Sequence, residues 1–229
     1  MIRKITLFML TLTIVCAPAL AAGDLTVNMD NMLAYDSYGY ATVEVYAEIE
    51  NTGDRDIEFS SGVVELFDAD GNTVASTDYL YSYPPVLAPG DKGYASAVLY
   101  MEEGIAAADI ADYSITVLGK SATTQVIRYE SEGTYLADVE EQYWTYDYVV
   151  AEIKNETDDP AYNFYCAYVI KDEAGDVLHF TYTSAYDVGI PAGGSILMRL
   201  TVPDYVIERF AEQGVSPATV ETFAYQINY

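Results

Sequence analysis

Apolar and polar residues alternate along much of the chain with a period of two. Between residues 42 and 50 the odd positions are apolar, whereas the even positions are mostly polar. This alternation is typical of an antiparallel strand with one face in a core and the other in solvent. It predicts a half-buried strand, with Ile49 in the core and Glu44, Tyr46 and Glu48 facing outward.

The same stretch occurs twice, at a constant offset of 104 residues. Aligning residues 44–71 with residues 148–175 without gaps gives eight identities, where ordinary composition would give roughly two. Each copy reads as a strand, a turn at Asn51 or Asn155, a second strand and a tight turn that ends in glycine. The chain therefore contains a duplicated structural unit.

Short strands separated by turn signals, about seven per hundred residues, are typical of β-sandwiches. The duplication then predicts an all-β chain of two tandem antiparallel β-sandwiches, over residues 23–120 and 121–229. One strand is expected over residues 73–83. One short helix is expected over residues 204–213, where Gly214 would end it.

The first 22 residues have the features of a cleaved signal peptide. Arg3 and Lys4 precede an apolar run over residues 5–15, and the small residues at 19–21 suit a cleavage site. The run is too short to span a membrane. The protein is therefore expected to be secreted or extracytoplasmic, or associated with the cell surface.

Removal of the signal peptide would leave eight basic residues against 36 acidic ones, a net charge near −28. Such a field repels nucleic acid and anionic lipid. It favours cations, basic partners or a saline medium, although solubility alone also explains it. We expect no nucleic-acid partner and no membrane span, and a cell-envelope protein or a glycan as partner. The oligomeric state does not follow from the sequence.

Short motifs mark turns and core positions of the first copy. They are Asn-Thr-Gly at 51–53, Val-Glu-Leu-Phe-Asp at 64–68 with Asp70-Gly71 after it, and Leu-Ala-Pro-Gly at 87–90. Together they resemble the FxLYD-type immunoglobulin-like domains of exported prokaryotic proteins, most closely over residues 40–118 and more faintly over 144–229. Val64 and Phe67 stand for the Phe and Tyr of the family signature. The resemblance implies tandem immunoglobulin-like β-sandwiches with an extracytoplasmic, non-catalytic role.

Catalytic chemistry finds little support in the sequence. His179 is the only histidine, and it lies in a strand pattern far from any serine motif. It is expected on a sheet surface, whereas Cys166 is expected to be a small buried side chain. Adjacent acids such as Glu140-Glu141 suggest glycosidase carboxylates, but nothing fixes their separation and a solvated face is the better explanation. We expect no enzymatic activity.

One turn offers ligands for a metal. Asp68, Asp70 and Asn72 alternate as the oxygen ligands of a calcium loop do. A full loop would need a bidentate acid near its twelfth position, where Asp78 and Tyr79 stand. An ordinary hairpin turn is the preferred interpretation, with calcium as the alternative and no other cofactor expected.

Aromatic rows are the best functional candidates. Flat exposed rings stack on sugar rings or anchor a protein partner, whereas tyrosine ladders that only stabilise a sheet are commoner. The sequence predicts a secreted or cell-surface binding or structural module that uses tyrosine-rich sheet faces and an acidic surface. The alternative is a secreted carbohydrate-active protein, either a glycan-binding accessory or a glycosidase. The candidate ligand-binding residues are Tyr79, Tyr81, Tyr83, Trp144, Tyr146 and Tyr148.

Overall fold

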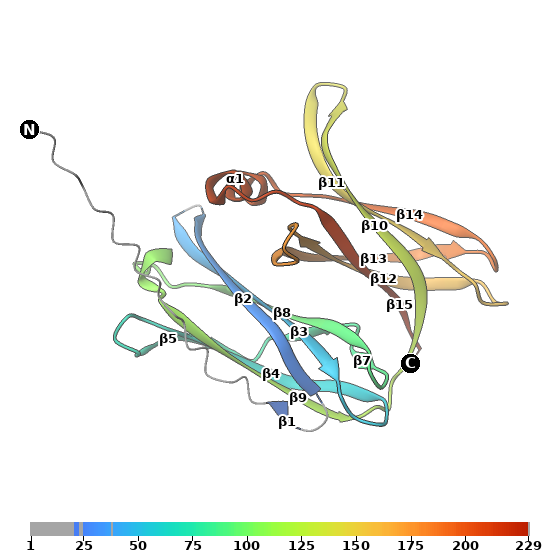
Figure 1. Ribbon diagram of the computed structural model, residues 1–229, viewed down its shortest axis with the longest axis horizontal. Coiled ribbons are helices and arrows are strands. Elements are labelled where there is room, and N and C mark those ends of the chain that lie inside the picture. The colour runs from blue at the N-terminus through green and yellow to red at the C-terminus, as the bar shows by residue number, and fades with distance from the viewer. Residues whose placement is uncertain (1–20, 23–24, 38, 229) are drawn as a thin grey trace, which may run out of the picture.

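The computed structural model describes residues 21–22, 25–37 and 39–228 of the chain (Figure 1). Most of the expected signal peptide lies outside these ranges, so cleavage and export stay predictions. Among the described residues, no helix has the length and the apolar character needed to cross a membrane. Antiparallel strand pairs make up most of the structure, and the predicted all-β class is confirmed.

In the N-terminal half, two sheets pack face to face. One has the order β1-β9-β4-β5, with β7 beside β4, and the other has the order β2-β3-β8-β6. The core between them includes Val43, Ile49, Leu66 and Val117. The elements are β1 (Ala21–Ala22), β2 (Leu25–Ser37), β3 (Tyr40–Asn51), β4 (Ile57–Phe67), β5 (Thr73–Thr77), β6 (Tyr81–Tyr83), β7 (Val86–Leu87), β8 (Lys92–Tyr100), the 3₁₀ turn η1 (Ala107–Asp109) and β9 (Asp112–Ser121).

The C-terminal half is one six-stranded sheet that curls around a second core, in the order β13-β12-β15-β10-β11-β14. Strand β10 connects the two parts of the curl, because its first residues pair with β15 and the rest pair with β11. The predicted helix, α1, packs Val206 and Phe210 on this core and ends at Gly214, whose φ is 66°. The elements are β10 (Gln125–Glu141), β11 (Trp144–Lys154), β12 (Ala161–Lys171), β13 (Val177–Ile190), β14 (Ser195–Thr201), α1 (Asp204–Gln213) and β15 (Thr219–Asn228).

The two halves pack against each other through sheet faces that point away from their own cores. The outer face of β2, β3, β8 and β6 meets the outer face of β12, β13 and β15 (Figure 1). The rings of Tyr94 and Phe180 stack there, with 6.0 Å between their centroids. We call this contact the seam. Its buried apolar residues are Tyr46, Tyr94, Ala167, Val169, Val177 and Phe180.

The seam corrects the prediction that the strand now seen as β3 is half-buried. Ile49 lies in the core as predicted, but Glu44, Tyr46 and Glu48 are buried too, beneath the C-terminal half. A period of two shows which side chains share a face of a strand. It does not show whether a second domain covers the polar face.

Equivalent positions of the repeat have equivalent surroundings. Ile49 and Ile153 are each fully buried in the core of their own half. The tight turns end in Gly71 and Gly175, whose φ angles of 81° and 90° are the positive values that favour glycine. The predicted division between residues 120 and 121 falls at the end of β9, and the domain limits themselves stay a prediction.

The single strand predicted over residues 73–83 is wrong, because this segment changes sheets. β5 pairs with β4 in one sheet, whereas β6 pairs with β8 in the other. The residues between them, 78–80, cross from one sheet to the other at the edge of the N-terminal half. Asp78 and Tyr79 are both exposed at this crossing, and the inward-facing positions change from odd (Ala75) in β5 to even (Leu80 and Ser82) after it.

Candidate functional site

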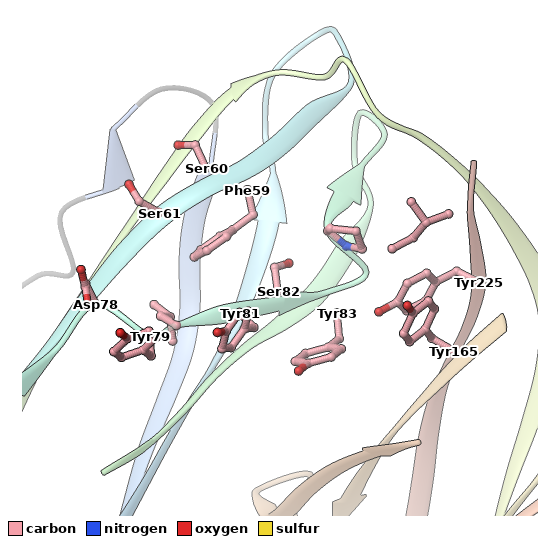
Figure 2. A pocket seen from close by; sticks show the side chains of 13 residues that line it. Phe59, Ser60, Ser61, Asp78, Tyr79, Tyr81, Ser82, Tyr83, Tyr165 and Tyr225 are labelled. Atoms are coloured by element: carbon pink, nitrogen blue, oxygen red, sulfur yellow. The ribbon is translucent and has the colours of Figure 1, made fainter. Parts of the chain in front are cut away.

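A cleft of about 450 Å³ lies where the two halves meet (Figure 2). Strands β4 and β6 and the crossing before β6 supply one side, and β12 and β15 supply the other. The cleft therefore depends on the docked arrangement of the halves. Its aromatic lining residues are Phe59, Tyr79, Tyr81, Tyr83, Tyr165 and Tyr225.

Three tyrosines follow one another along the N-terminal side of the cleft (Figure 2). Tyr81 and Tyr83 belong to β6, and Tyr79 continues their row in the crossing segment, while Leu80 and Ser82 are buried on the other side. Side chains two residues apart on an extended chain are about 6.6 Å apart. Tyr79 and Tyr81 keep 71% and 57% of their surface exposed, so both rings are accessible to a ligand.

Aromatic contacts fix the rings at the inner end of the row. Tyr83 stacks on Tyr182 with 4.4 Å between ring centroids, and Tyr165 stacks on Tyr225 with 5.3 Å between them. Burial raises the pKa of Tyr83 above its ordinary value, and Tyr182 raises it further, so the Tyr83 hydroxyl stays neutral at physiological pH. These rings are held in place before any ligand arrives, which lowers the entropic cost of binding.

Charge is sparse in the cleft. Asp78 is the one acidic side chain among the described lining residues, and none of these is basic. The hydroxyls of Ser60 and Ser82 donate to backbone carbonyls, at 2.9 Å from Leu118 O and 2.6 Å from Pro84 O. The exposed Ser60 oxygen can still accept a hydrogen bond from a ligand, whereas Ser82 is buried. The lining therefore suits stacking and neutral hydrogen bonding more than proton transfer, which needs positioned acids and bases.

The second predicted aromatic group lies apart from the cleft. Trp144 begins β11 at the tip of the β10–β11 hairpin, where its side chain is 70% exposed. Tyr146 and Tyr148 share a face of β11 as predicted, with tilted rings 5.9 Å apart. The guanidinium of Arg199 covers the Tyr148 ring at 4.1 Å from its centroid. Trp144 is therefore exposed on the outer surface of the C-terminal half and Tyr146 is half-buried, whereas Tyr148 is only 4% exposed and is not the accessible ring that the sequence predicted.

The predicted metal residues form a tight hairpin turn. Asp68 Oδ1 accepts hydrogen bonds from the backbone N–H groups of Asp70 and Asn72, at 2.9 and 2.8 Å. Asn72 Nδ2 donates to Asp68 Oδ2 at 2.9 Å, and these hydrogen bonds lower the pKa of Asp68. Among the described residues no group of three or more His, Cys, Asp or Glu side chains is arranged to hold a metal. The predicted hairpin turn between β4 and β5 is present, and calcium binding at this turn stays an alternative prediction.

His179 is not on a sheet surface, which corrects the sequence prediction. It is buried in the seam, with its Nδ1 atom 3.6 Å from Glu44 Oε2. Burial raises the pKa of Glu44, but nearby His179, the Tyr35 hydroxyl at 2.8 Å and Arg209 lower it more, so this carboxyl stays ionised. The prediction for His179 was wrong because the N-terminal half covers the outer face of its strand, β13.

Cys166 is fully buried, as predicted. Burial raises the pKa of its thiol to about 12. The thiolate is the reactive form of cysteine, so this side chain is inert at neutral pH.

Sequence reasoning missed the C-terminal side of the cleft. Tyr165 and Tyr225 are far from Tyr79–Tyr83 along the chain and meet this row only because the halves dock. A partial signal was present, since Tyr165 aligns with Ser61 in the repeat. An aromatic residue at a predicted outward position of the second copy indicated a covered or binding face.

Comparisons with known proteins do not identify a family. No family model and no curated protein matches the chain. Among solved structures, the crystal structure of red sea bream transglutaminase is similar, with 11% sequence identity and a TM-score of 0.23. The match covers 90% of this chain but only 29% of that one. A likeness this weak supports no argument about function.

Proposed function

We propose that this protein is a non-catalytic binding module, whose ligand lies along the tyrosine row of the cleft. The exposed rings of Tyr79 and Tyr81, followed by the fixed rings of Tyr83 and Tyr165, carry the proposal. An extended ligand with flat apolar faces and hydroxyl groups fits such a lining. A polysaccharide chain has this chemistry, since its sugar faces can stack on the rings and its hydroxyls can bond to exposed polar groups of the lining such as the Ser60 hydroxyl.

The absence of a charged pair in the lining supports binding over hydrolysis. Glycoside hydrolysis ordinarily uses two carboxyl groups on either side of the bond that breaks, and the described lining offers Asp78 alone. A glycosidase, the alternative from the sequence, would have to place its carboxylates elsewhere. Secretion to the envelope, which the expected signal peptide favours, would bring the cleft to such ligands.

We also propose that both halves are variants of one immunoglobulin-like sandwich, as the FxLYD resemblance implies. The matching burial of Ile49 and Ile153 supports a common plan. The turns at Gly71 and Gly175 support it too. The C-terminal half then differs by closing its two sheets into one through the long strand β10.

Retention on purified cell-wall polysaccharides tests the proposed function. The probes are insoluble cellulose, chitin and peptidoglycan, incubated with the chain from residue 23 onward. We expect retention on at least one of them without release of soluble sugar. Tyr81→Ala should weaken this retention by about tenfold, as the loss of a central aromatic contact does.

Tyr100→Ala is the matched control, because Tyr100 is an exposed strand tyrosine outside the cleft lining. It should bind as the wild type does. Retention that Tyr81→Ala leaves unchanged would place binding elsewhere. Release of sugar would show an enzyme, and no retention on any probe would reject a polysaccharide ligand.

A further inference from the structure

The two halves dock asymmetrically, and this leaves one sheet face without its counterpart. In the repeat, β3 and β8 of the first half correspond to β11 and β14 of the second. The outer face of β3 and the part of β8 around Tyr94 are buried in the seam, whereas Val98 and Tyr100 of β8 stay exposed. The corresponding outer face of β11 and β14, together with β10, is exposed. We call it the free face, and its central residues are Leu136, Val150, Glu152, Leu197 and Arg199.

Paired positions establish which residues correspond. Glu48 lies opposite Tyr94 in the first half, and Glu152 lies opposite Leu197 in the second. Tyr94 is 1% exposed at the centre of the seam, whereas Leu197 is 68% exposed. The position that anchors the docked contact in one half is thus an exposed apolar side chain in the other.

The apolar surface around Leu197 is larger than one residue. Leu136 on β10 is also exposed, and Val150 on β11 is half-buried between the two. Val149 and Ala151 of β11 point into the core, so the alternate residues of β11 point outward. Residues opposite these in register share the outward face, which places Leu136, Val150 and Leu197 on it. A group of exposed apolar side chains on one sheet face is typical of an interaction site.

The carboxylate of Glu152 on the free face indicates that a docked partner would carry a positive charge there. In the seam, Glu48 lies 2.6 Å from Lys92 of its own half and 4.0 Å from Lys171 of the docked half. Glu152 has the same place on the free face, but Ser195 replaces the neighbouring lysine. In the part of the chain that the structure describes, the nearby cations pair with other acids, Lys154 with Glu130 and Arg199 with Glu141, and Lys154 acts on Glu152 only electrostatically. A docked partner with a basic residue at this point would supply a cation for Glu152.

We propose that the free face docks a sheet of a β-sandwich domain in another protein, in the way that the seam docks the two halves. The partner sheet would have a small apolar centre and a lysine or arginine opposite Glu152. The docked face of the seam has this chemistry, with Val169 and Phe180 at its centre and Lys171 beside Glu48.

A second copy of this chain does not fit the free face. The docked face of the seam corresponds in the first half to the outer face of β4, β5 and β9. There Glu65 stands for Val169, Phe67 for Lys171 and Ser76 for Phe180. A carboxylate would enter the apolar centre, and no base would reach Glu152. The strongly negative charge of the chain also opposes self-association.

The correspondence between β4 and β5 in the first half and β12 and β13 in the second suggests a variant that tests the free face. Replacing Glu65→Val, Phe67→Lys and Ser76→Phe together in the full chain gives β4 and β5 the chemistry of the docked face. Such a contact is heterologous, so copies would join head to tail in open chains. The measurement is the weight-average mass by sedimentation, at concentrations up to about 1 mM so that weak contacts are also detected.

We expect the wild type to stay monomeric and the mass of the triple variant to rise with concentration. Adding Leu197→Glu should lower the association constant of the triple variant by about tenfold, as the loss of an anchoring contact does. Adding Val188→Glu, at an exposed position of β13 outside the free face, should leave association unchanged. Thermal unfolding of each variant checks that it is folded.

Three results would overturn the proposal. A folded triple variant that remains monomeric would show that the free face does not accept this chemistry. Association that Leu197→Glu does not weaken would place the contact elsewhere. Wild-type association that Leu197→Glu abolishes would make a second copy the occupant. None of these outcomes depends on ligand binding in the cleft.

Discussion

At the scale of residues, Asn51 and Asn155 show how closely the two halves follow one plan. Each side-chain amide donates to one carbonyl in the following turn and to one buried carbonyl of a later loop. From Asn51 these are Arg55 O and Leu87 O, at 2.7 and 2.8 Å. Asn155 bonds in the same way to Asp159 O and Ile190 O, at 2.8 and 3.0 Å. Through these hydrogen bonds each asparagine links the turn after its strand, β3 or β11, to a loop later in the same half.

Substituting alanine for Asn51 should destabilise the protein by about 2 kcal/mol, because two backbone carbonyls, one of them buried, lose their donor. Asn155→Ala should have a similar effect. Asn28→Ala is the control, since this exposed amide bonds only to the Glu48 and Glu50 carboxylates, and it should cost under about 0.5 kcal/mol. Urea unfolding measures all three. Equal small effects at all sites would contradict the shared role of the two buried asparagines.

The sequence predicted residues well wherever local chemistry decides their place. Tyr79, Tyr81 and Tyr83 share a face as the alternation predicted, and Cys166 is buried. His179 was misplaced because its surroundings come from the other half of the chain. Contacts between distant segments leave no local periodicity, so a residue in the seam looks like a surface residue in the sequence.

At the scale of elements, the hydrophobic pattern located the strands and the helix but not the sheets to which they belong. Helix α1 has the predicted limits, 204–213. The segment 73–83 instead divides between two sheets. This division places Tyr79 and β6 at the edge of the N-terminal half, beside β12 and β15. The cleft therefore depends on a change of sheet that alternation alone cannot reveal.

The connection between the halves is held by Glu58 of β4. Its Oε2 atom accepts from the backbone N–H groups of Thr123 and Thr124 at 3.0 and 3.3 Å, and Lys120 Nζ lies 3.2 Å from Oε1. The Thr123 backbone contributes most to lowering the pKa of Glu58, from an ordinary 4.5 to about 2. The carboxylate thus fixes the short segment between β9 and β10.

A lowered carboxyl pKa gives stability that is present above the ordinary value and is lost as pH falls to the folded value. The advantage of the wild type over Glu58→Gln should therefore be about 1 kcal/mol near pH 7, because solvent screens this surface group. It should shrink between pH 4.5 and about 2. Unfolding free energies across this range test it, with Glu103→Gln in an exposed turn as the control for charge. An advantage that is constant with pH would contradict it.

At the scale of the whole molecule, the two halves are held together by the seam, in which the polar face of β3 packs against the C-terminal half. The seam buries aromatic rings and carboxylates together, and Tyr94 lies at its centre with its hydroxyl 3.1 Å from Glu48 Oε2. Both the cleft and the free face follow from this docking. One lies at the edge of the seam, and the other is the surface that the docking does not use.

The repeat supplies a matched pair of substitutions for the seam. Tyr94→Ala should destabilise the protein by about 3 kcal/mol, because it removes a fully buried ring. Leu197→Ala, at the corresponding exposed position, should change stability by less than about 0.5 kcal/mol. Urea unfolding compares the two, and Tyr94→Ala should also separate the unfolding of the halves into two transitions. Equal effects at both positions would show that the seam is not buried in solution.

The distance between the halves tests this arrangement most directly. Spin labels at Glu65→Cys on β4 and Ser195→Cys on β14, in the chain from residue 23 onward, report it by pulsed electron resonance. Both positions are exposed, Cys166 is buried from the reagent, and Cys16 is not in this chain. A fixed seam predicts a single narrow distribution of distances. A broad distribution, as from two domains moving freely on the segment between β9 and β10, would contradict the docked arrangement.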